Sequence, residues 1–222
     1  EFRRVLFRSK RIRGGENWRK ASTAVYAEGS YGNGAAMRSP ILALFFAGDR
    51  DGLLSAAQTS AAVTHAHPIG IEGAVMIAIA VYALLEGQNA SEVLKSVQDC
   101  CDSPEIASKL SKVASWISTK ASPLPRDVAA QLGNGITVPL SCPTALYIAL
   151  RHLDQPFETL IQFGIRCRGN VDTITAIAGA LWGIANGAEK LPDVNLEAKE
   201  RIVETALKLF RHHPFQSQSK PS

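Results

Sequence analysis

The chain has 222 residues, 46% of them hydrophobic, which is enough to bury a sizeable core, most simply as one domain with tails. The net charge of +4 is concentrated at the start: the first twenty residues hold eight Lys or Arg and two Glu, whereas the rest holds 16 basic and 18 acidic side chains. Outside this leader nothing in the composition favours nucleic-acid binding, so we expect no DNA partner.

The leader, EFRRVLFRSKRIRGG, is rich in arginine and lacks the apolar segment of a secretory signal. Val5 to Ser9 correspond to the codons GTG CTC TTC CGA TCT, which resemble a sequencing-adapter tail. We therefore expect residues 1–10 to be a non-native leader that replaces the native upstream sequence; a mitochondrial presequence is the alternative. The four cysteines fit no disulfide framework or zinc spacing, so we expect reduced thiols in an intracellular protein of the cytoplasm, nucleus or mitochondrial matrix.

Apolar residues recur at three and four positions along most of the chain, which indicates helices. We expect a single all-α domain over residues 11–211 and a disordered tail over 212–222. The apolar run from Gly73 to Leu85 is too short for a bilayer, so we expect a buried central helix and no membrane association. The predicted helices cover residues 35–47, 52–64, 70–86, 90–101, 104–119, 126–132, 143–153, 157–166, 172–186 and 195–211.

The stretch GSYGNGAAMR, from Gly29 to Arg38, is a glycine-rich loop that runs into a helix. Its glycines permit a tightly folded backbone whose N–H groups face outward, and the helix start adds partial positive charge. Both features suit a phosphate group, and Tyr31 could stack on a base or ribose. The alternative is a structural turn, because the spacing matches neither a P-loop nor a dinucleotide fingerprint.

The helix predicted over residues 172–186 is preceded by the polar residues Asn170, Asp172 and Thr173. In a purely structural interpretation, Asn170 is the N-cap and Asp172 is a first-turn carboxylate that the helix dipole favours. In a functional interpretation, the three side chains present oxygen ligands for a hard cation such as Mg²⁺. A cluster of this size is under-ligated unless carboxylates from elsewhere complete it.

Four motifs occur together in a fixed order, and in this combination they resemble the ADP-ribosylglycohydrolase family. The similarity is strongest to the branch that removes ADP-ribose from serine and degrades poly(ADP-ribose). It extends over about Gly29 to Pro192 and implies a compact orthogonal multi-helix domain, incomplete at its N-terminus. The motifs are GSYGNGAAMR, THAHPIGIEGAV, Leu132 to Ile136 with the following CPTALY, and RGNVDTITAIAGALWGIANGAEKLP.

The resemblance also implies a two-magnesium centre that hydrolyses a glycosidic bond at the ribose C1″ of ADP-ribose. In the family's Gly-Gly-Asp-Thr-Asp-Thr motif both aspartates and the last threonine bind magnesium; the matching residues run from Arg168 to Thr173, so the implied metal ligands are Asn170, Asp172 and Thr173. His65 would approach the ligand and Ile136 would line the pocket. The implied contacts to the phosphates and ribose come from Gly29, Ser30, Tyr31, Gly32, Asn33 and Gly34.

The sequence departs from the family pattern at two places. Arg168 stands where the family has glycine and Asn170 where it has aspartate, so a negative charge is lost beside the metal site and the affinity for Mg²⁺ should fall. The family's Thr-Asp-Asp triplet and its early acidic residue lie upstream of the glycine-rich loop and have no match in this sequence. We therefore expect the catalytic acidic residue upstream of this chain.

From the resemblance we expect a magnesium-dependent hydrolase that releases ADP-ribose from serine in proteins or from poly(ADP-ribose), with impaired activity in this chain. The expected partners are ADP-ribose, ADP-ribosylated proteins and poly(ADP-ribose), and the expected state is a monomer. One alternative is a non-catalytic ADP-ribose-binding or structural member of the family. A second is a helical interaction scaffold, which would have no need of glycine-rich loops.

Overall fold

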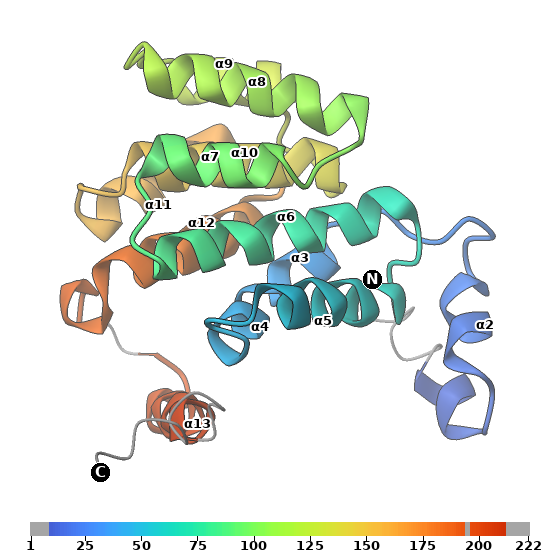
Figure 1. The fold of residues 1–222 in the computed structure, drawn as a ribbon. Helices are drawn as coiled ribbons and strands as arrows, with labels where there is room; N and C mark the ends of the chain where they lie inside the picture. The colour runs from blue at the N-terminus through green and yellow to red at the C-terminus, as the bar shows by residue number, and fades with distance from the viewer. Residues whose placement is uncertain (1–8, 194–195, 212–222) are drawn as a thin grey trace.

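A computed structural model describes residues 9–193 and 196–211, and Figure 1 shows this part of the chain to be built from helices. Within it the only extended pairing is an isolated antiparallel bridge between Gly32 and Thr137. The prediction of an all-α domain is confirmed. The expected disordered tail and most of the expected non-native leader lie outside the described residues, although residues 9–13 are helical.

Helix α6, Pro68–Leu85, is the central helix of the domain and contacts α3, α4, α5, α7, α10 and α12. It is long and apolar enough to cross a membrane, but 67% of it is buried inside the protein, as in a core helix. Gly73 brings α10 close, because a Cβ there would lie 2.5 Å from the Val138 side chain. The predicted central helix over 70–86 is confirmed.

The helices stack in layers around α6 (Figure 1). Helices α8, Pro104–Ser118, and α9, Pro125–Leu132, lie at the top of the view. The layers below contain α7, Ala90–Gln98, α10, Val138–Arg151, α11, Phe157–Cys167, and α12, Val171–Asn186, and then α3, Gly34–Arg38, α4, Pro40–Phe45, and α5, Arg50–Ala62.

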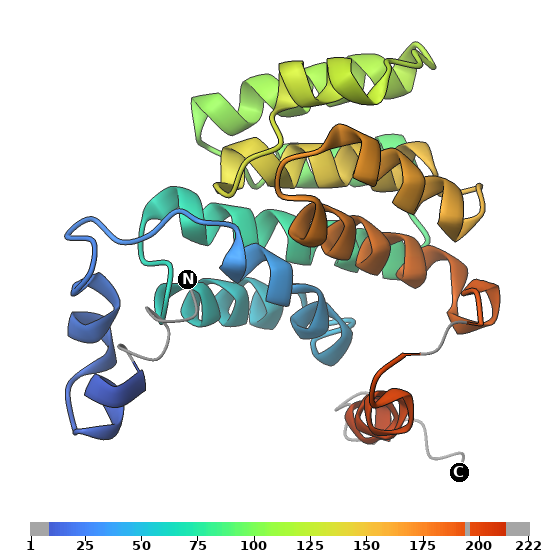
Figure 2. The same ribbon diagram turned by 180° about the vertical axis from the view of Figure 1, so that it is seen from behind.

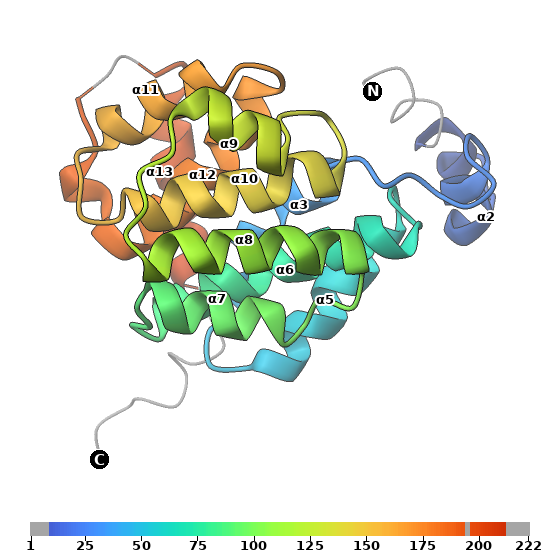
Figure 3. The same ribbon diagram turned by 90° about the horizontal axis from the view of Figure 1, so that it is seen from above.

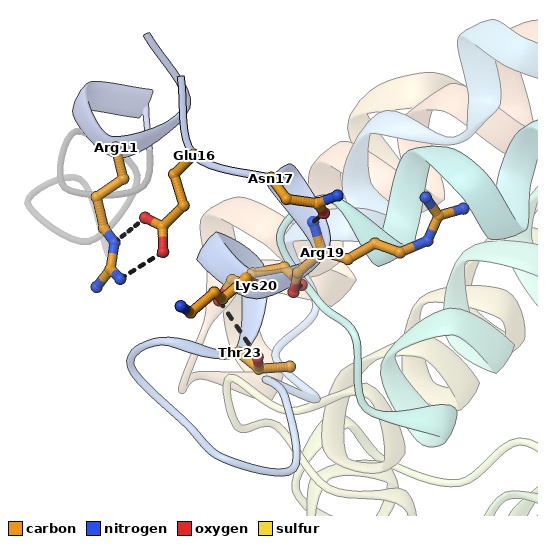
Figure 4. A network of polar contacts seen from close by, with 7 residues as sticks. Arg11, Glu16, Asn17, Arg19, Lys20 and Thr23 are labelled. Atoms are coloured by element: carbon orange, nitrogen blue, oxygen red, sulfur yellow. Dashed lines mark hydrogen bonds and ion pairs between the residues drawn. The ribbon is translucent and has the colours of Figure 1, made fainter. Parts of the chain in front are cut away.

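Two helices lie at the periphery of the stack: Figure 1 shows the helix over residues 199–211 below it, and Figures 1 and 3 show the helix over residues 18–23 at one edge. Helix α13, Lys199–Arg211, packs against α4, and helix α2, Trp18–Thr23, stands at one edge. Around α2 the contacts are mostly local and polar: Arg11 pairs with Glu16, and the Asn17 side chain accepts a hydrogen bond from the Arg19 N–H at 2.9 Å (Figure 4). The sequence did not predict α2, because a six-residue polar helix shows no apolar period.

The predicted helix over 35–47 is wrong as one element, since the structure divides it into α3 and α4 at Ser39. Pro40 has no N–H and cannot donate to the Ala36 carbonyl one turn earlier. The Ser39 N–H and hydroxyl occupy that carbonyl instead, at 3.2 and 2.9 Å. The break orients α3 independently of α4.

The predicted start of the helix over 143–153 is also wrong, because α10 begins at Val138 and contains Pro143 in its interior. A proline inside a helix leaves the carbonyl four residues earlier without its partner. Here that carbonyl belongs to Pro139, and Lys109 of α8 donates to it at 2.7 Å. A neighbouring helix thus compensates for the proline, which sequence reasoning took as a boundary.

The remaining predicted helices match the structure within a few residues, although α13 begins at Lys199 rather than at 195. A short 3₁₀ helix, Ala188–Lys190, was not predicted. The four cysteines are free thiols, as expected. Burial raises the pKa of Cys142 to about 12 and that of Cys167 to about 11, which fits packing rather than reactivity.

Candidate functional site

The segments that precede α3, α10 and α12 lie on one side of the molecule and are joined by backbone hydrogen bonds (Figure 2). The Asn33 N–H donates to the Ile136 carbonyl at 3.0 Å, and the Val138 N–H donates to the Tyr31 carbonyl at 3.0 Å. The Asn170 N–H donates to the Asn134 carbonyl at 2.7 Å. Three motifs that are far apart in the sequence therefore form one cluster of loops.

The glycine-rich loop depends on Gly29 for its close approach to the start of α6. Gly29 has φ of +84°, and a Cβ at this position would lie 2.3 Å from the His67 backbone nitrogen. Both the left-handed conformation and the contact exclude a side chain. The tightly folded loop predicted from the glycines is thus fixed by contact with the start of α6. The prediction that its N–H groups face outward is wrong for Gly29, Gly32 and Asn33, whose N–H groups donate to other groups of the protein.

A cavity of about 190 Å³ opens against this loop. Five residues expected to bind the substrate line it: Gly29, Ser30, Tyr31, Gly32 and Ile136, together with Tyr26 and Thr137, which the sequence did not single out.

Three large side chains that line this cavity are open to solvent. Tyr26 is 39% exposed. Tyr31 is 45% exposed and Ile136 is 65% exposed. Ligand pockets usually exceed about 300 Å³, so this cavity fits a sugar ring or a phosphate rather than a whole dinucleotide. Tyr26 could have been found from its place one turn before Gly29, whose N–H donates to the Tyr26 carbonyl at 2.9 Å.

Asn33, Gly34 and His65 lie beneath the loop rather than on the cavity wall. His65 is 2% exposed, and a Cβ on Gly34 would lie 3.0 Å from its ring. Its Nδ1 is 2.7 Å from the Thr64 hydroxyl, which accepts a hydrogen bond from Arg38 at 2.8 Å. His65 therefore supports the loop from below, and its direct approach to a ligand stays a prediction.

The turn before α12 has an unusual backbone. Arg168 has φ of 59° and ψ of −165°, a region that is essentially restricted to glycine. Gly169 follows with φ of +71°, and a Cβ there would lie 2.1 Å from the Asn134 carbonyl oxygen. The Asn134 side chain donates to the Cys167 carbonyl at 3.0 Å and completes the turn. The turn retains a glycine conformation at a position that carries arginine.

The α12 N-terminus does not use Asn170 as an ordinary cap. Asn170 is the N-cap residue, but its side chain makes no capping hydrogen bond. Its Nδ2 donates instead to Asp172 Oδ1 at 2.8 Å, and the same oxygen accepts the Thr173 N–H at 2.8 Å. The structural interpretation holds for Asp172, which lies in the first turn, but not for the side chain of Asn170.

A buried amide joins this terminus to the glycine-rich loop. Asn33, 7% exposed, donates through Nδ2 to Asn170 Oδ1 at 2.8 Å and to the Ser141 hydroxyl at 3.0 Å. The structure therefore brings the predicted substrate loop and the predicted metal ligands into direct contact. Ser141 was missed, although a serine in the mostly apolar α10 was a usable signal.

Three side chains at this terminus carry oxygen atoms of the kind that bind a hard cation. They comprise the Asp172 carboxylate, the Asn170 amide and the Thr173 hydroxyl, and Thr173 is 9% exposed. Among the residues that the structure describes, no three His, Cys, Asp or Glu side chains gather as a metal site. Magnesium prefers near-octahedral oxygen coordination, so these donors fit one edge of a single ion and do not fit a two-ion centre.

Comparison of the sequence with known proteins identifies its family. Residues 2–218 match the sequence profile of the ADP-ribosylglycohydrolase family. The chain is 33% identical to ADP-ribosylhydrolase ARH3 of Homo sapiens over 207 residues, which cover 80% of this chain and 56% of the relative. For ADP-ribosylhydrolase ARH3 of Bos taurus the identity is 31% over 218 residues, covering 85% and 59%.

A more distant relative is an uncharacterized protein of Archaeoglobus fulgidus, 30% identical over 188 residues that cover 81% of this chain and 58% of that protein. The chain thus spans a little over half the length of the relatives that it matches. The family match extends over nearly the whole sequence, including all three loops of the site. The chain therefore belongs to the ADP-ribosylglycohydrolase family.

Proposed function

We propose that this chain is part of a hydrolase that releases ADP-ribose from serine in modified proteins or from poly(ADP-ribose). The observation that carries the proposal is the joined site. The cavity lined by Gly29 to Gly32 and Ile136 is tied to the α12 N-terminus through the Asn33 to Asn170 hydrogen bond of 2.8 Å. We propose that a ligand held in the cavity extends toward Asp172 and Thr173.

The loop amides suggest how the ligand would be held. The Gly29, Gly32 and Asn33 N–H groups are engaged inside the protein, with Tyr26, the Ser30 hydroxyl and Ile136. We propose that the Ser30 and Tyr31 amides donate to the ligand and that the Tyr31 ring, which lines the cavity, covers it. This arrangement suits a phosphate beside a ribose, where backbone donors satisfy the oxygens and the aromatic ring covers the sugar.

The proposed reaction is hydrolysis at the ribose C1″. Water adds to C1″, the bond from C1″ to the serine oxygen breaks, and the serine hydroxyl leaves with a proton. The loop and Tyr31 would fix the position of the ribose, which lowers the entropic part of the barrier. The cavity lining contains no carboxylic acid that could transfer the proton.

The proposal includes Mg²⁺ as a weakly held cofactor, with Asp172 and Thr173 on one side of the ion; the Asn170 amide oxygen, which accepts from Asn33, would reach the ion only after that hydrogen bond breaks. When bound, magnesium would orient the ribose hydroxyls and polarise a water. Because these donors fit only one edge of an ion, we propose that hydrolysis by this chain is slow.

The test uses an ADP-ribosylated serine peptide with MgCl₂, and free ADP-ribose is measured by mass spectrometry. ADP-ribose binding is measured separately by calorimetry for the wild type, Tyr31→Ala and Ile136→Ala. The matched control is Met37→Ala, because Met37 is 47% exposed but does not line the cavity. We expect both cavity variants to weaken binding about tenfold and the control to bind normally; equal binding by all four proteins would contradict the proposal.

A second candidate function is ADP-ribose binding without hydrolysis, and the neutral Asn170 beside a lone Asp172 favours it. The two functions differ in whether ADP-ribose is released once the turn before α12 has the residues of the family motif. Release of ADP-ribose after Arg168→Gly and Asn170→Asp together would support a hydrolase. Binding without any release would support the non-catalytic function.

A further inference from the structure

The side chains that link the loops form a hydrogen-bond chain with a fixed direction. The Ser141 hydroxyl donates to the Thr137 carbonyl at 2.8 Å, so its oxygen must accept from Asn33. The amide nitrogen of Asn33 therefore faces both Ser141 and Asn170. Asn170 must in turn present its oxygen to Asn33, which turns its own nitrogen toward Asp172.

This series of hydrogen bonds ends at Asp172, whose carboxylate accepts hydrogen bonds and donates none. The Asp172 carboxylate accepts from Asn170 Nδ2 and from the Thr173 N–H through the same oxygen. Hydrogen bonds to a carboxylate are stronger than those between neutral groups, and bonds in a chain polarise one another. The orientation of every amide is thus imposed by its neighbours.

A carboxylate at position 170 could not take this place. One of its oxygens would still accept from Asn33, but the other would face Asp172 Oδ1 where the Asn170 nitrogen now stands, 2.8 Å away. Two carboxylate oxygens at that separation repel each other unless a proton or a cation lies between them. The Asn170 N–H therefore occupies the electrostatic position of a cation.

We infer that Asn170 stabilises the α12 N-terminus without a metal ion. Its amide N–H takes the place of a divalent cation beside Asp172 and holds the cavity loop in place without magnesium. The inference rests on the proposed site but not on hydrolysis. A magnesium ion that binds Asp172 must displace the charge-assisted hydrogen bond from Asn170, and it gains only one carboxylate ligand in return. Magnesium binding is therefore weak in this chain and is not needed for the shape of the cavity.

Thermal unfolding in MgCl₂ and in EDTA, at ionic strength matched with NaCl, tests the inference. We expect the wild-type midpoint to be the same in both buffers within about 1 °C. Asn170→Asp should unfold about 5 °C lower in EDTA, because about 2 kcal/mol of repulsion shifts the midpoint by that amount in a chain of this size. Magnesium should restore most of the loss and should bind this variant about tenfold more tightly.

The matched control is Asn89→Asp, which makes the same change at the exposed N-cap of α7. Asn89 Oδ1 accepts from the Ser91 and Glu92 N–H groups at 3.0 and 3.2 Å, and a carboxylate keeps both bonds. We expect no magnesium response from this variant. A response equal to that of Asn170→Asp would show nonspecific ion binding and would overturn the inference.

Asp172→Asn keeps the test decisive if Asn170→Asp does not fold. The asparagine oxygen can still accept from Asn170 and Thr173, so we expect a small midpoint change and no response to magnesium. A wild-type midpoint that magnesium raises by several degrees, with the rise abolished in Asp172→Asn, would overturn the inference.

Calorimetry with ADP-ribose in both buffers separates this inference from the proposed function. Equal affinity in MgCl₂ and EDTA is expected. If ADP-ribose binds in neither buffer the proposed function fails, while the unfolding midpoints still decide the role of Asn170. Binding that requires magnesium would overturn the inference and leave the proposed function standing.

Discussion

The candidate site has two halves, the glycine-rich loop before α3 and the turn before α12. They differ in which residue occupies a backbone conformation that favours glycine. At Gly29 the left-handed backbone carries glycine, and no side chain would fit against His67. At Arg168 the backbone adopts a conformation that only glycine favours, yet the residue carries a long cation. The loop before α3 thus has glycine where its backbone requires glycine. The turn before α12 has arginine there and keeps the same kind of backbone in spite of the strain.

This difference indicates which contacts hold each half. The glycine-rich loop is fixed by backbone packing on α6 and by the bridge to Thr137. The α12 turn is held from outside by Asn134, which binds the Asn170 N–H and the Cys167 carbonyl. Substitutions in the first half should therefore act through sterics, and those in the second through hydrogen bonds and backbone strain.

The largest expected effect comes from Gly29→Ala. The methyl group meets the His67 backbone in a left-handed conformation, so we expect a loss of about 3 kcal/mol in the free energy of unfolding. Gly87→Ala is the control, because Gly87 has φ of +76° with nothing within 4 Å of its added Cβ, and should cost about 1 kcal/mol. Urea unfolding measures both; equal losses would show that backbone strain alone fixes the loop.

Asn33→Ala removes the link between the two halves. It deletes a buried amide that donates to Ser141 and Asn170, and we expect a loss of about 2 kcal/mol. A double-mutant cycle with Asn170→Ala should give a coupling energy of about 1 kcal/mol. Strict additivity would mean that the two halves are stabilised independently.

Arg168→Gly should stabilise the protein by about 1 kcal/mol, because glycine adopts the observed backbone without strain. Lys120→Gly is a useful comparison, since Lys120 also has a positive φ, of 53°, but lies in a turn outside the site. The gain at position 168 should be the larger. A loss of stability in Arg168→Gly would show that the arginine side chain contributes more than its backbone costs.

The smallest effect concerns pH and comes from His152, which follows α10 and lies outside both halves of the site. Burial is the main cause that lowers the pKa of His152 below its ordinary value, and its Nδ1 lies 2.7 Å from the Ile148 carbonyl. The unfolded chain therefore binds a proton more readily, so stability is full above about pH 6.5 and declines as the pH falls toward the lower, folded pKa. His152→Asn should flatten the decline in unfolding curves recorded from pH 7 to 5; an unchanged slope would assign it to other groups.

Much of the fold was predictable from sequence because helical periodicity and loop composition are local signals. One error arose because a residue distant in the sequence satisfied a group that a proline left without a partner. Another arose because a continuous apolar pattern concealed a helix break. Pro143 predicts a helix boundary from sequence, but Lys109 donates to the Pro139 carbonyl that the proline leaves without a partner, and the helix continues. Pro40 did break a helix, but the apolar residues on both sides of it concealed the division.

The candidate site was predictable to the extent that its residues cluster in motifs. The cavity residues of the loop and Ile136 were all named from sequence, and the structure places them together. Sequence could not show that Asn33 lies under the loop and contacts Asn170, because these residues are 137 positions apart. Nor could it show that the Asn170 side chain makes no capping hydrogen bond and donates to the Asp172 carboxylate instead.

The cross-loop hydrogen bonds of Asn33, Val138 and Asn170 have a consequence for hydrogen exchange. Surface loops commonly open one at a time, and their amide protons exchange at unrelated rates. Here each of the three amides is bonded to a carbonyl of another loop, so none is released unless two segments separate. The three protons should exchange through one shared opening, and the mouth of the cavity should behave as a single cooperative unit.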